Sequence, residues 1–323
     1  MNKVLGSIFT ATVLLAAGGA AASEVVRLGN IKLAHFGAIS YIKEIAPKCG
    51  IRVEEKVFAK GLDVMQAIIA GELDVGATAS EAAISGRAGG APIYTVAGFA
   101  RGGARLVARP EQNIRNVPQL KGKRVGVTRG AIQEVLLMAE LAKHGLSASP
   151  EPGKDVQLVF LSYADLNQAL LGSQIDAMMQ SEPQSSQAIN KGFGVEVLKP
   201  YDTPIGEPIR TLVMTEKFYR DRRPVAEKFM RCFVEATRTF IDNPAVAEKY
   251  VREVIFKNQI TSDDFQDAIR NSPYSYTITP EHIQITTDIM ARTGVGRMAR
   301  PPVAKDWVQT DLLDAAIKDL KLR

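Results

Sequence analysis

Two segments of the chain combine a polar or aromatic side chain with a Gly-Ala pair. They are His35-Phe36-Gly37-Ala38 and Arg129-Gly130-Ala131, and each follows a run of β-type residues. Glycine lets a ligand atom approach the backbone, and the free N–H groups of a helix that starts there favour an anion. The Arg129 guanidinium adds a planar pair of donors suited to a carboxylate, sulfonate or phosphate group. These residues predict a site for a small anion.

Two more polar segments follow later β-type runs, and they are Thr78-Ala79-Ser80 and Gln180-Ser181-Glu182. Ser80 fits either a ligand contact or the ordinary N-cap of a helix. Glu182 fits either an acceptor for an amine or hydroxyl of the ligand or a simple helix-start carboxylate. We include both segments in the predicted site and leave these alternatives open.

Three charged or titratable residues are weaker candidates for the same site. His35 fits a loop or packing role as well as a ligand contact. Arg101 and Arg210 fit surface or hinge ion pairs, because each lies beside a predicted strand end or crossover.

The chain lacks the short motifs of common catalytic and metal sites. It has no glycine-rich phosphate loop, no Gly-x-Ser-x-Gly turn and no His-Glu-x-x-His pair. Three histidines and two distant cysteines do not predict a zinc cluster. We therefore expect neither a metal nor another cofactor, and no enzymatic activity.

An internal repeat predicts the elements that position these residues. Residues 57–74 align with residues 159–176 without a gap, at a constant separation of 102 residues. Upstream, Gly37-Ala38-Ile39 returns as Gly130-Ala131-Ile132. The identical pairs of the longer alignment are Val57/Val159, Phe58/Phe160, Asp63/Asp165, Gln66/Gln168, Ala67/Ala169 and Asp74/Asp176.

Each copy of the repeat predicts the order strand, helix, strand, helix, strand. This alternation is typical of parallel α/β sheets, so two copies predict two similar lobes. Ligands of such sheets lie beyond the carboxyl ends of the strands, and four helix N-termini should therefore face one cleft. The predicted strands are 25–33, 53–58, 73–77, 123–128, 156–161 and 175–179, and the predicted helices are 38–46, 62–70, 131–144 and 164–171.

The remaining chain predicts two more strands and a helical C-terminal part. The strands are 93–99 and 211–214, and the helices are 225–241, 244–254, 263–271, 280–292 and 304–320. A strand that returns before a helical tail indicates that the chain crosses back to the first lobe. We place the crossovers near Glu111 and Thr211, so that lobe one contains residues 23–111 and 212–323 and lobe two contains residues 112–211.

The first 22 residues predict a cleaved signal peptide. A lysine at position 3 precedes an apolar run that is too short to span a membrane, and small residues precede Ser23. Neither Cys49 nor Cys232 lies near the cleavage region, so we expect an unlipidated protein in a Gram-negative periplasm. A disulfide between the two cysteines is compatible with that compartment, but buried free thiols are commoner, and we expect free thiols.

The charge of the chain is only mildly basic. It has 40 Lys and Arg residues against 35 Asp and Glu residues, a formal charge of +5. The basic residues are spread along the whole chain and do not alternate with aromatic residues, so we expect no nucleic-acid partner.

Several short segments together resemble the periplasmic binding proteins of nitrate, sulfonate and taurine ABC importers. The resemblance implies two α/β lobes of the type II-like periplasmic binding protein fold, with two crossover segments and a helical C-terminal part. It also implies a monomer that closes on a small ligand and delivers it to a membrane permease and its ATPase. The segments are Val26-Arg27-Leu28-Gly29, Gln66-Ala67, Gly71-Glu72-Leu73-Asp74-Val75-Gly76, Leu120-Lys121-Gly122-Lys123-Arg124-Val125-Gly126-Val127, Gln168-Ala169-Leu170 and Asp176-Ala177.

One segment departs from the pattern of the sulfonate-binding members. Ser181-Glu182-Pro183-Gln184 stands where they commonly carry a Trp-Asp-Pro-Tyr type motif. A taurine-like, carboxylate or heterocyclic ligand therefore stays open beside a sulfonate. Thiamine-pyrimidine synthases share the fold, but the cysteine cluster expected of them has no counterpart in this sequence. A sensory receptor that uses the same cleft is a further alternative.

Overall fold

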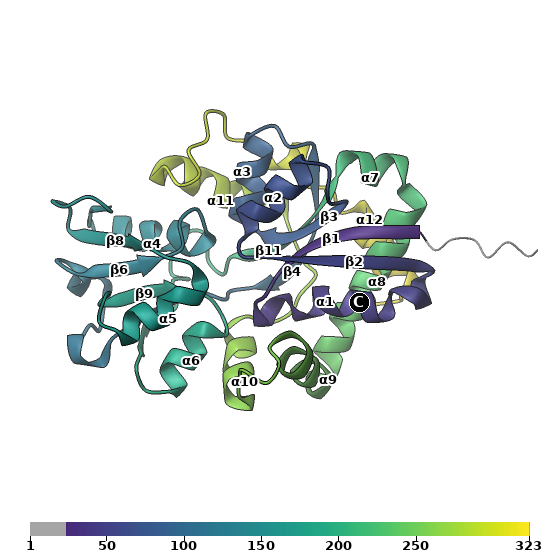
Figure 1. Ribbon diagram of the computed structural model, residues 1–323. Coiled ribbons are helices and arrows are strands. Elements are labelled where there is room, and N and C mark those ends of the chain that lie inside the picture. Colours follow the sequence, from purple (N-terminus) through teal and green to yellow (C-terminus); the bar gives the residue numbers. More distant parts are fainter. Residues whose placement is uncertain (1–23, 323) are drawn as a thin grey trace, which may run out of the picture.

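The computed structural model describes residues 24–322, which form two α/β lobes side by side (Figure 1). The predicted fold is confirmed, whereas the predicted signal peptide lies outside the described residues. The sheet of lobe one has the order β2-β1-β3-β11-β4, with strands β1 (Glu24–Ile31), β2 (Ile51–Phe58), β3 (Val75–Ala79), β4 (Ile93–Arg101) and β11 (Ile209–Thr215). The sheet of lobe two has the order β10-β5-β9-β6-β8-β7, with strands β5 (Arg105–Ala108), β6 (Arg124–Val127), β7 (Ala148–Ser149), β8 (Val156–Phe160), β9 (Ala177–Gln180) and β10 (Val195–Leu198).

Both sheets are mixed, although the repeat predicts parallel ones. The three strands of each repeat copy are parallel: β1 pairs with β2 and β3, and β6 pairs with β8 and β9. Beside these three strands, each sheet has a strand that is antiparallel to its neighbours: β11 to β3 and β4, and β5 to β9 and β10. These two strands enter directly from the other lobe, and an antiparallel strand needs no crossover helix to take its place in a sheet.

The chain passes between the lobes at the ends of these strands. The first passage comprises residues 102–104, between β4 and β5, and the second comprises residues 199–208, between β10 and β11. The predicted boundaries at 111/112 and 211/212 lie on the C-terminal side of these passages.

Helices cover both faces of each sheet. In Figure 1, α2 and α3 lie on one side of the first sheet, and α1 and α8 lie on the other. The helices of the repeat are α1 (Gly37–Ile45), α2 (Gly61–Ile69) and α3 (Ser80–Ala88) in lobe one and α4 (Ile132–Lys143), α5 (Tyr163–Leu171) and α6 (Gln184–Asn190) in lobe two.

One ion pair recurs in both lobes and shows that the sequence repeat is also a structural repeat. In lobe one, the Asp74 carboxylate accepts hydrogen bonds from the backbone and the guanidinium of Arg27, at 2.8–3.1 Å. In lobe two, Asp176 accepts the same bonds from Arg124, at 2.9–3.3 Å. We call these pairs the Arg–Asp clamps. Each clamp joins the first strand of its copy to the turn before the third strand.

The C-terminal part is helical, as predicted, with one exception. The expected helix at 304–320 is confirmed only in its second half, α12 (Asp311–Asp319). Its first part is a 3-10 turn at Ala304–Asp306 followed by an extended stretch, because Thr95 of β4 exchanges backbone hydrogen bonds with Trp307 and Gln309. The helices are α7 (Glu216–Asp221), α8 (Arg223–Asp242), α9 (Pro244–Lys249), a π-helical turn (Tyr250–Ile255), α10 (Ser262–Asn271), α11 (Pro280–Thr293) and α12 (Asp311–Asp319).

Helix α10 packs on lobe two, although its sequence follows the return to lobe one. It contacts α6, where the Asn190 amide donates to Asp264. Asp267 of α10 forms an ion pair with Arg105 of β5 at 2.8 Å. The two lobes therefore share the C-terminal part.

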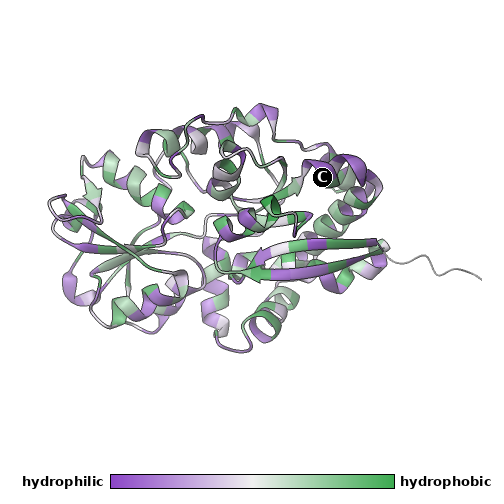
Figure 2. Cartoon of the chain, turned by 45° about the horizontal axis from the view of Figure 1, so that its top comes forward, coloured by the Kyte–Doolittle hydropathy of each residue, from purple (hydrophilic) through white to green (hydrophobic). Residues whose placement is uncertain are grey.

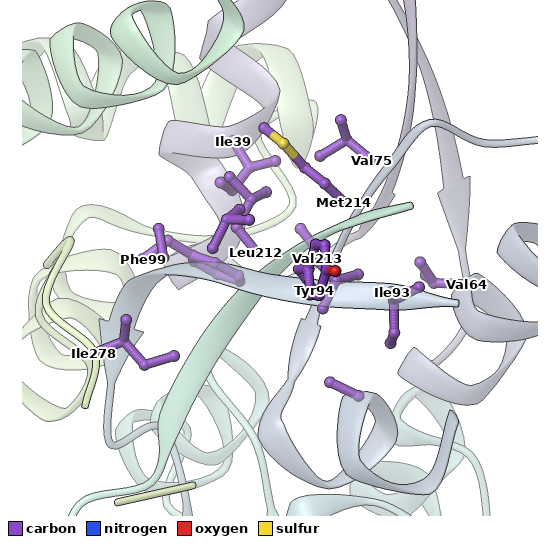
Figure 3. Packing of buried hydrophobic residues seen from close by; sticks show 14 of the residues in the cluster. Ile39, Val64, Val75, Ile93, Tyr94, Phe99, Leu212, Val213, Met214 and Ile278 are labelled. Carbon is purple, nitrogen blue, oxygen red and sulfur yellow. The ribbon is translucent and has the colours of Figure 1, made fainter. Parts of the chain in front are cut away.

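The core of lobe one is apolar and lies between its sheet and the covering helices. Figure 3 shows Phe99 of β4, Leu212 of β11 and Ile39 of α1 packed together. The helices carry both hydrophilic and hydrophobic residues (Figure 2), as amphipathic helices that cover a sheet do.

Lobe one also contains a disulfide. Cys49 and Cys232 are bonded, with their Cα atoms 6.1 Å apart. The expectation of free thiols is therefore wrong. A sequence separation of 183 residues hid the pairing, which arises because α8 packs beside the turn that follows α1.

Candidate functional site

A cluster of polar side chains, most of them buried, lies where the two lobes meet, and we call it the interlobe cluster. Lobe one contributes the buried His35, Glu81 and Arg210, and lobe two contributes the buried Gln133 and the partly buried Tyr163. The Tyr163 hydroxyl donates to Gln133 at 2.8 Å, which fixes the two lobe-two side chains together. Burial is the first cause that raises the pKa of Tyr163, and the nearby Glu81 carboxylate raises it further.

The first passage between the lobes is hydrogen-bonded to side chains of the cluster from both lobes. The Gly103 carbonyl accepts hydrogen bonds from Arg210 at 3.1 Å, Gln133 at 3.2 Å and Ser181 at 3.4 Å. Gly103 has a φ of 77°, and a Cβ at this position would lie 2.9 Å from the Arg210 guanidinium. Glycine is therefore required where the passage meets the site.

Arg210 of β11 is a buried cation without a direct carboxylate partner. Its side chain donates to His35 Nε2 at 3.1 Å and to the carbonyls of Gly102 and Gly103, and it is 1% exposed. No ion pair within 4.0 Å includes Arg210 among residues 24–322. Burial lowers the pKa of the guanidinium, whereas the Glu81 charge opposes this shift.

His35 is held as a neutral imidazole. Because Arg210 has only donors, His35 Nε2 must accept, and the proton of the neutral ring then lies on Nδ1. Burial and the Arg210 charge hold the pKa of His35 well below its usual range. His35 Nδ1 is a buried donor with no hydrogen-bond partner among the described atoms.

Glu81 is the buried carboxylate of the cluster. It lies in the first turn of α3, it is 3% exposed, and burial raises its pKa to about 7. Arg210 opposes this pKa shift, as do the backbone amides of Glu81 and Ala82 in lobe one and of Ile132 in lobe two. Ile132 is the first residue of α4, so the carboxylate lies between the N-termini of one helix from each lobe.

Two cavities open at the mouth of the cleft above this cluster. Their volumes are about 360 and 310 Å³, and Ala59, Ser162 and Tyr163 line both. Lys32 lines the first cavity, and Lys60 and Arg129 line the second. No Asp or Glu side chain is among the described residues that line either cavity. The mouth is therefore a basic surface.

Arg129 lies at this mouth and not in the buried cluster. Its guanidinium stacks on the Phe160 ring, 3.9 Å from the ring centroid. The backbone amides next to it already have partners, because Gly130 donates to the Glu134 carboxylate and Ala131 donates to the Thr128 carbonyl. The predicted contact of Arg129 with a ligand stays a prediction, and the two amides are not free to join it in this conformation.

The equivalent segment of lobe one has a packing role. A Cβ on Gly37 would lie 2.5 Å from the Val251 side chain, so this glycine makes room for the C-terminal part. Phe36 stacks edge-on against Phe99, and Ala38 lies in an apolar cluster with Phe240. In this conformation these residues contact protein side chains, and their predicted contact with a ligand stays a prediction.

The segment that follows β3 differs slightly from the prediction. Thr78 and Ala79 lie inside β3, which extends to residue 79, and Ser80 is the first residue of α3. The N-cap is Ala79, so the expected capping role of Ser80 is wrong. The hydroxyls of Thr78 and Ser80 are buried without hydrogen-bond partners among the described atoms.

Glu182 of the last predicted segment is an ion-pair residue. Its carboxylate lies 2.8 Å from Arg105 Nε and accepts from Asn271 at 2.7 Å and from Ser186. Burial raises the pKa of Glu182, and the Arg105 charge opposes the shift. These bonds join lobe two to α10 and match the helix-start alternative; the predicted contact of Glu182 with a ligand stays a prediction.

Of the remaining predicted residues, Gln180 supports the interlobe cluster and Arg101 does not belong to it. Gln180 lies at the end of β9 and donates to the Tyr163 carbonyl at 3.0 Å, so it supports the cluster. Arg101 lines a different cavity, where its Nε lies 3.9 Å from the Glu207 carboxylate. The sequence indicated Arg210 only as a weaker candidate for the ligand site, and it did not indicate Glu81, Gln133 or Tyr163. The repeat offered one usable signal, because Glu81 and Tyr163 both lie in the first turn of a repeat helix.

Within residues 24–322, no group of three His, Cys, Asp or Glu side chains is placed to hold a metal ion. None of the helices in the same range is long and apolar enough to cross a membrane.

Comparison with known proteins extends these observations. A protein of Brachyspira hyodysenteriae that is named an ABC transporter periplasmic binding protein is 22% identical over 292 residues, covering 84% of this chain and 82% of that protein. The alkanesulfonate-binding protein SsuA from Xanthomonas axonopodis pv. citri, bound to MOPS, matches with a TM-score of 0.75 at 18% identity, covering 88% of this chain and 98% of that chain. The nitrate-binding protein NrtA from Synechocystis PCC 6803 also gives a TM-score of 0.75, at 16% identity, covering 93% and 90%.

The sequence pattern of the NMT1-like family matches residues 19–255, which is most of the chain. The matched proteins are named as binding proteins rather than as enzymes, and they confirm the resemblance to the binding proteins of nitrate and sulfonate importers. This chain therefore belongs to the NMT1-like family, and it has the fold of the periplasmic binding proteins to which it is similar.

Proposed function

We propose that this protein captures a small anionic organic solute between its lobes and delivers it to the permease and ATPase of an ABC importer. The solute is a sulfonate, a taurine-like molecule or a carboxylate, and the protein works as a monomer. The observation that carries the proposal is the basic mouth of the cleft, with Lys32, Lys60 and Arg129 and no lining carboxylate in the described residues.

Electrostatics explains why this mouth favours an anion. A cleft lined by charges of one sign, with low-dielectric walls, concentrates ions of the opposite sign. Arg129 is held in place by its stack on Phe160, so its donors lose little freedom when they bind a ligand oxygen. Buried Arg210 adds a further positive charge at the base of the same cleft.

The disulfide supports a periplasmic location. Disulfides persist in oxidising compartments such as the bacterial periplasm and are rare in the cytosol. The Cys49–Cys232 bond therefore agrees with export by the signal peptide proposed for residues 1–22. A receptor for a sensory system would use the same cleft, but no residue described above favours that alternative over transport.

The test begins with protein isolated from the periplasm of its host. Denaturation should release a small anionic solute that mass spectrometry identifies. Recovery of only a metal or a nucleotide would overturn the proposal.

Calorimetry with the recovered solute then tests whether the basic mouth of the cleft binds it. Arg129→Ala should weaken binding about tenfold, because a charge-assisted hydrogen bond contributes about 1.5–3 kcal/mol. Arg115→Ala is the matched control, since Arg115 is an exposed arginine of lobe two that lines neither cavity. Equal affinities of the two variants would remove Arg129 from the site.

A further inference from the structure

Glu81 places a carboxyl group at the helix N-termini that would otherwise favour a bound anion. Helix N-termini stabilise anions, and this carboxylate already lies near the first amides of α3 and of α4. A second anionic group at the same place would meet a like charge in a buried environment. The base of the cleft therefore differs in charge from its mouth.

Two buried acceptors at the base of the cleft lack a hydrogen-bond donor among the described residues. Glu81 Oε2 and the Ser80 hydroxyl are buried and have no partner among the described atoms, and a buried acceptor without a donor costs about 1–3 kcal/mol. Two charged or titratable groups on neighbouring elements interact with Glu81: the Arg210 charge of β11 lowers the pKa of Glu81, and the Glu81 charge raises the pKa of Tyr163 of α5. Arg210 directs Nε and Nη2 to His35 and to backbone carbonyls, and it makes no ion pair with Glu81 within 4.0 Å.

A solute can reach this carboxylate through the mouth when the lobes part. Tyr163 lines both mouth cavities, and its phenol is close enough to Glu81 for the carboxylate to raise the pKa of the phenol. Tyr163 thus connects the basic mouth with the Glu81 carboxylate at the base of the cleft.

We infer that Glu81 is a specificity-determining residue that selects solutes with an amino group in addition to their anionic group. The inference rests on the proposed function. In the bound state, the anionic end of the solute lies toward Lys60 and Arg129, and the ammonium group donates to Glu81. The ligand class is that of zwitterionic aminosulfonates and aminocarboxylates, and plain anions such as nitrate bind less well.

This arrangement makes proton release a signature of binding. Burial raises the pKa of Glu81 to about 7 when no cation is bound, so part of the population carries a proton at neutral pH. An ammonium group favours the ionised carboxylate, so its binding should expel that proton. Titration calorimetry at pH 7 in two buffers with different ionisation enthalpies measures the number of protons released.

The experiment uses pairs of acids that differ by an amino group: taurine with ethanesulfonate, β-alanine with propionate, and 4-aminobutyrate with butyrate. Affinities are measured by calorimetry for the mature protein, for Glu81→Gln and for Glu140→Gln. Glu140 is the matched control because it is also 3% exposed and its pKa is also raised by burial, but it lies toward the opposite end of α4 from Ile132.

The expected result is at least tenfold tighter binding of the amino member of one pair, with proton release, in the mature protein and in Glu140→Gln. Glu81→Gln should lose that preference by about tenfold or more. Thermal melting of the unliganded variants shows that they are folded.

Other outcomes separate this inference from the proposed function. If plain anions bind as tightly as their amino partners, or if Glu81→Gln keeps the preference, the inference is wrong and the proposed function stands. If no acid in the panel binds, the solute recovered from the periplasm decides: a solute without an amino group overturns the inference alone, and the absence of any small organic solute overturns both.

Discussion

The two lobes share one plan but use it differently. Each has an Arg–Asp clamp, three parallel strands in the same order and an antiparallel strand that arrives from the other lobe. They differ at the Gly-Ala pair that follows the first strand. Gly37 of lobe one is covered by Val251 and Phe240, whereas Gly130 of lobe two faces Leu62 across the cleft. Equivalent positions of a repeat therefore need not share a role, because the C-terminal part covers only one of them.

The disulfide gives the largest expected difference between the lobes, because only lobe one contains it. Replacing both cysteines by serine should lower the free energy of unfolding by about 2–4 kcal/mol. Urea unfolding followed by the fluorescence of Trp307, the single tryptophan and a core residue of lobe one, measures this loss. Titration of two free thiols in the untreated periplasmic protein would contradict the prediction.

Breaking either Arg–Asp clamp should lower the free energy of unfolding by the same amount. Asp74→Asn and Asp176→Asn each remove the charge that accepts several hydrogen bonds from an arginine, so each should cost about 1.5–3 kcal/mol. Although burial disfavours its charge, the hydrogen bonds from Arg124 hold the pKa of Asp176 below its ordinary value.

Circular dichroism during urea unfolding compares the two variants. If one variant loses more than twice as much free energy of unfolding as the other, the two clamps are not equivalent.

Substitutions in the two Gly-Ala pairs should have the smallest effects on stability. They should also differ most between the lobes. Gly37→Ala forces a methyl group against Val251, and overpacking of this kind costs about 1–3 kcal/mol. Gly130→Ala places alanine at a φ of 71°, which costs about 1–2 kcal/mol, and its methyl group meets Leu62 of the other lobe.

Solute affinity separates the two substitutions. Gly130→Ala should weaken binding, because it keeps the lobes apart, whereas Gly37→Ala should lower the melting temperature and leave the affinity unchanged. The reverse assignment would contradict the proposed difference between the lobes.

The sequence predicted the parts of the fold that rest on local pattern. The repeat copies and most C-terminal helices are confirmed because their periodicity is strong. Strands β5, β7 and β10 were missed because they lie outside the repeat, and β5 and β10 pair antiparallel with distant segments. The disulfide was missed for the same reason, since its cysteines meet only after α8 packs on lobe one.

The site was harder to predict than the fold. Glu81 looks in sequence like an ordinary acidic residue in the first turn of a helix, and its burial arises only where α3 meets lobe two. Arg210 lies in a strand, and its importance follows from its contacts with His35 and Gly103. Such contacts depend on how the lobes meet, and no local pattern records that.

The distance between the lobes tests the central claim most directly. No free cysteine is present among the described residues, so cysteines introduced by Lys121→Cys in lobe two and Lys217→Cys in lobe one can be spin-labelled selectively. These lysine side chains are 71% and 85% exposed, so the labels should not disturb the core. Capture of a solute between the lobes predicts a broad distance distribution without solute and a single narrow one at saturation, because the solute favours the closed state. Identical distributions with and without a solute that binds would contradict the account.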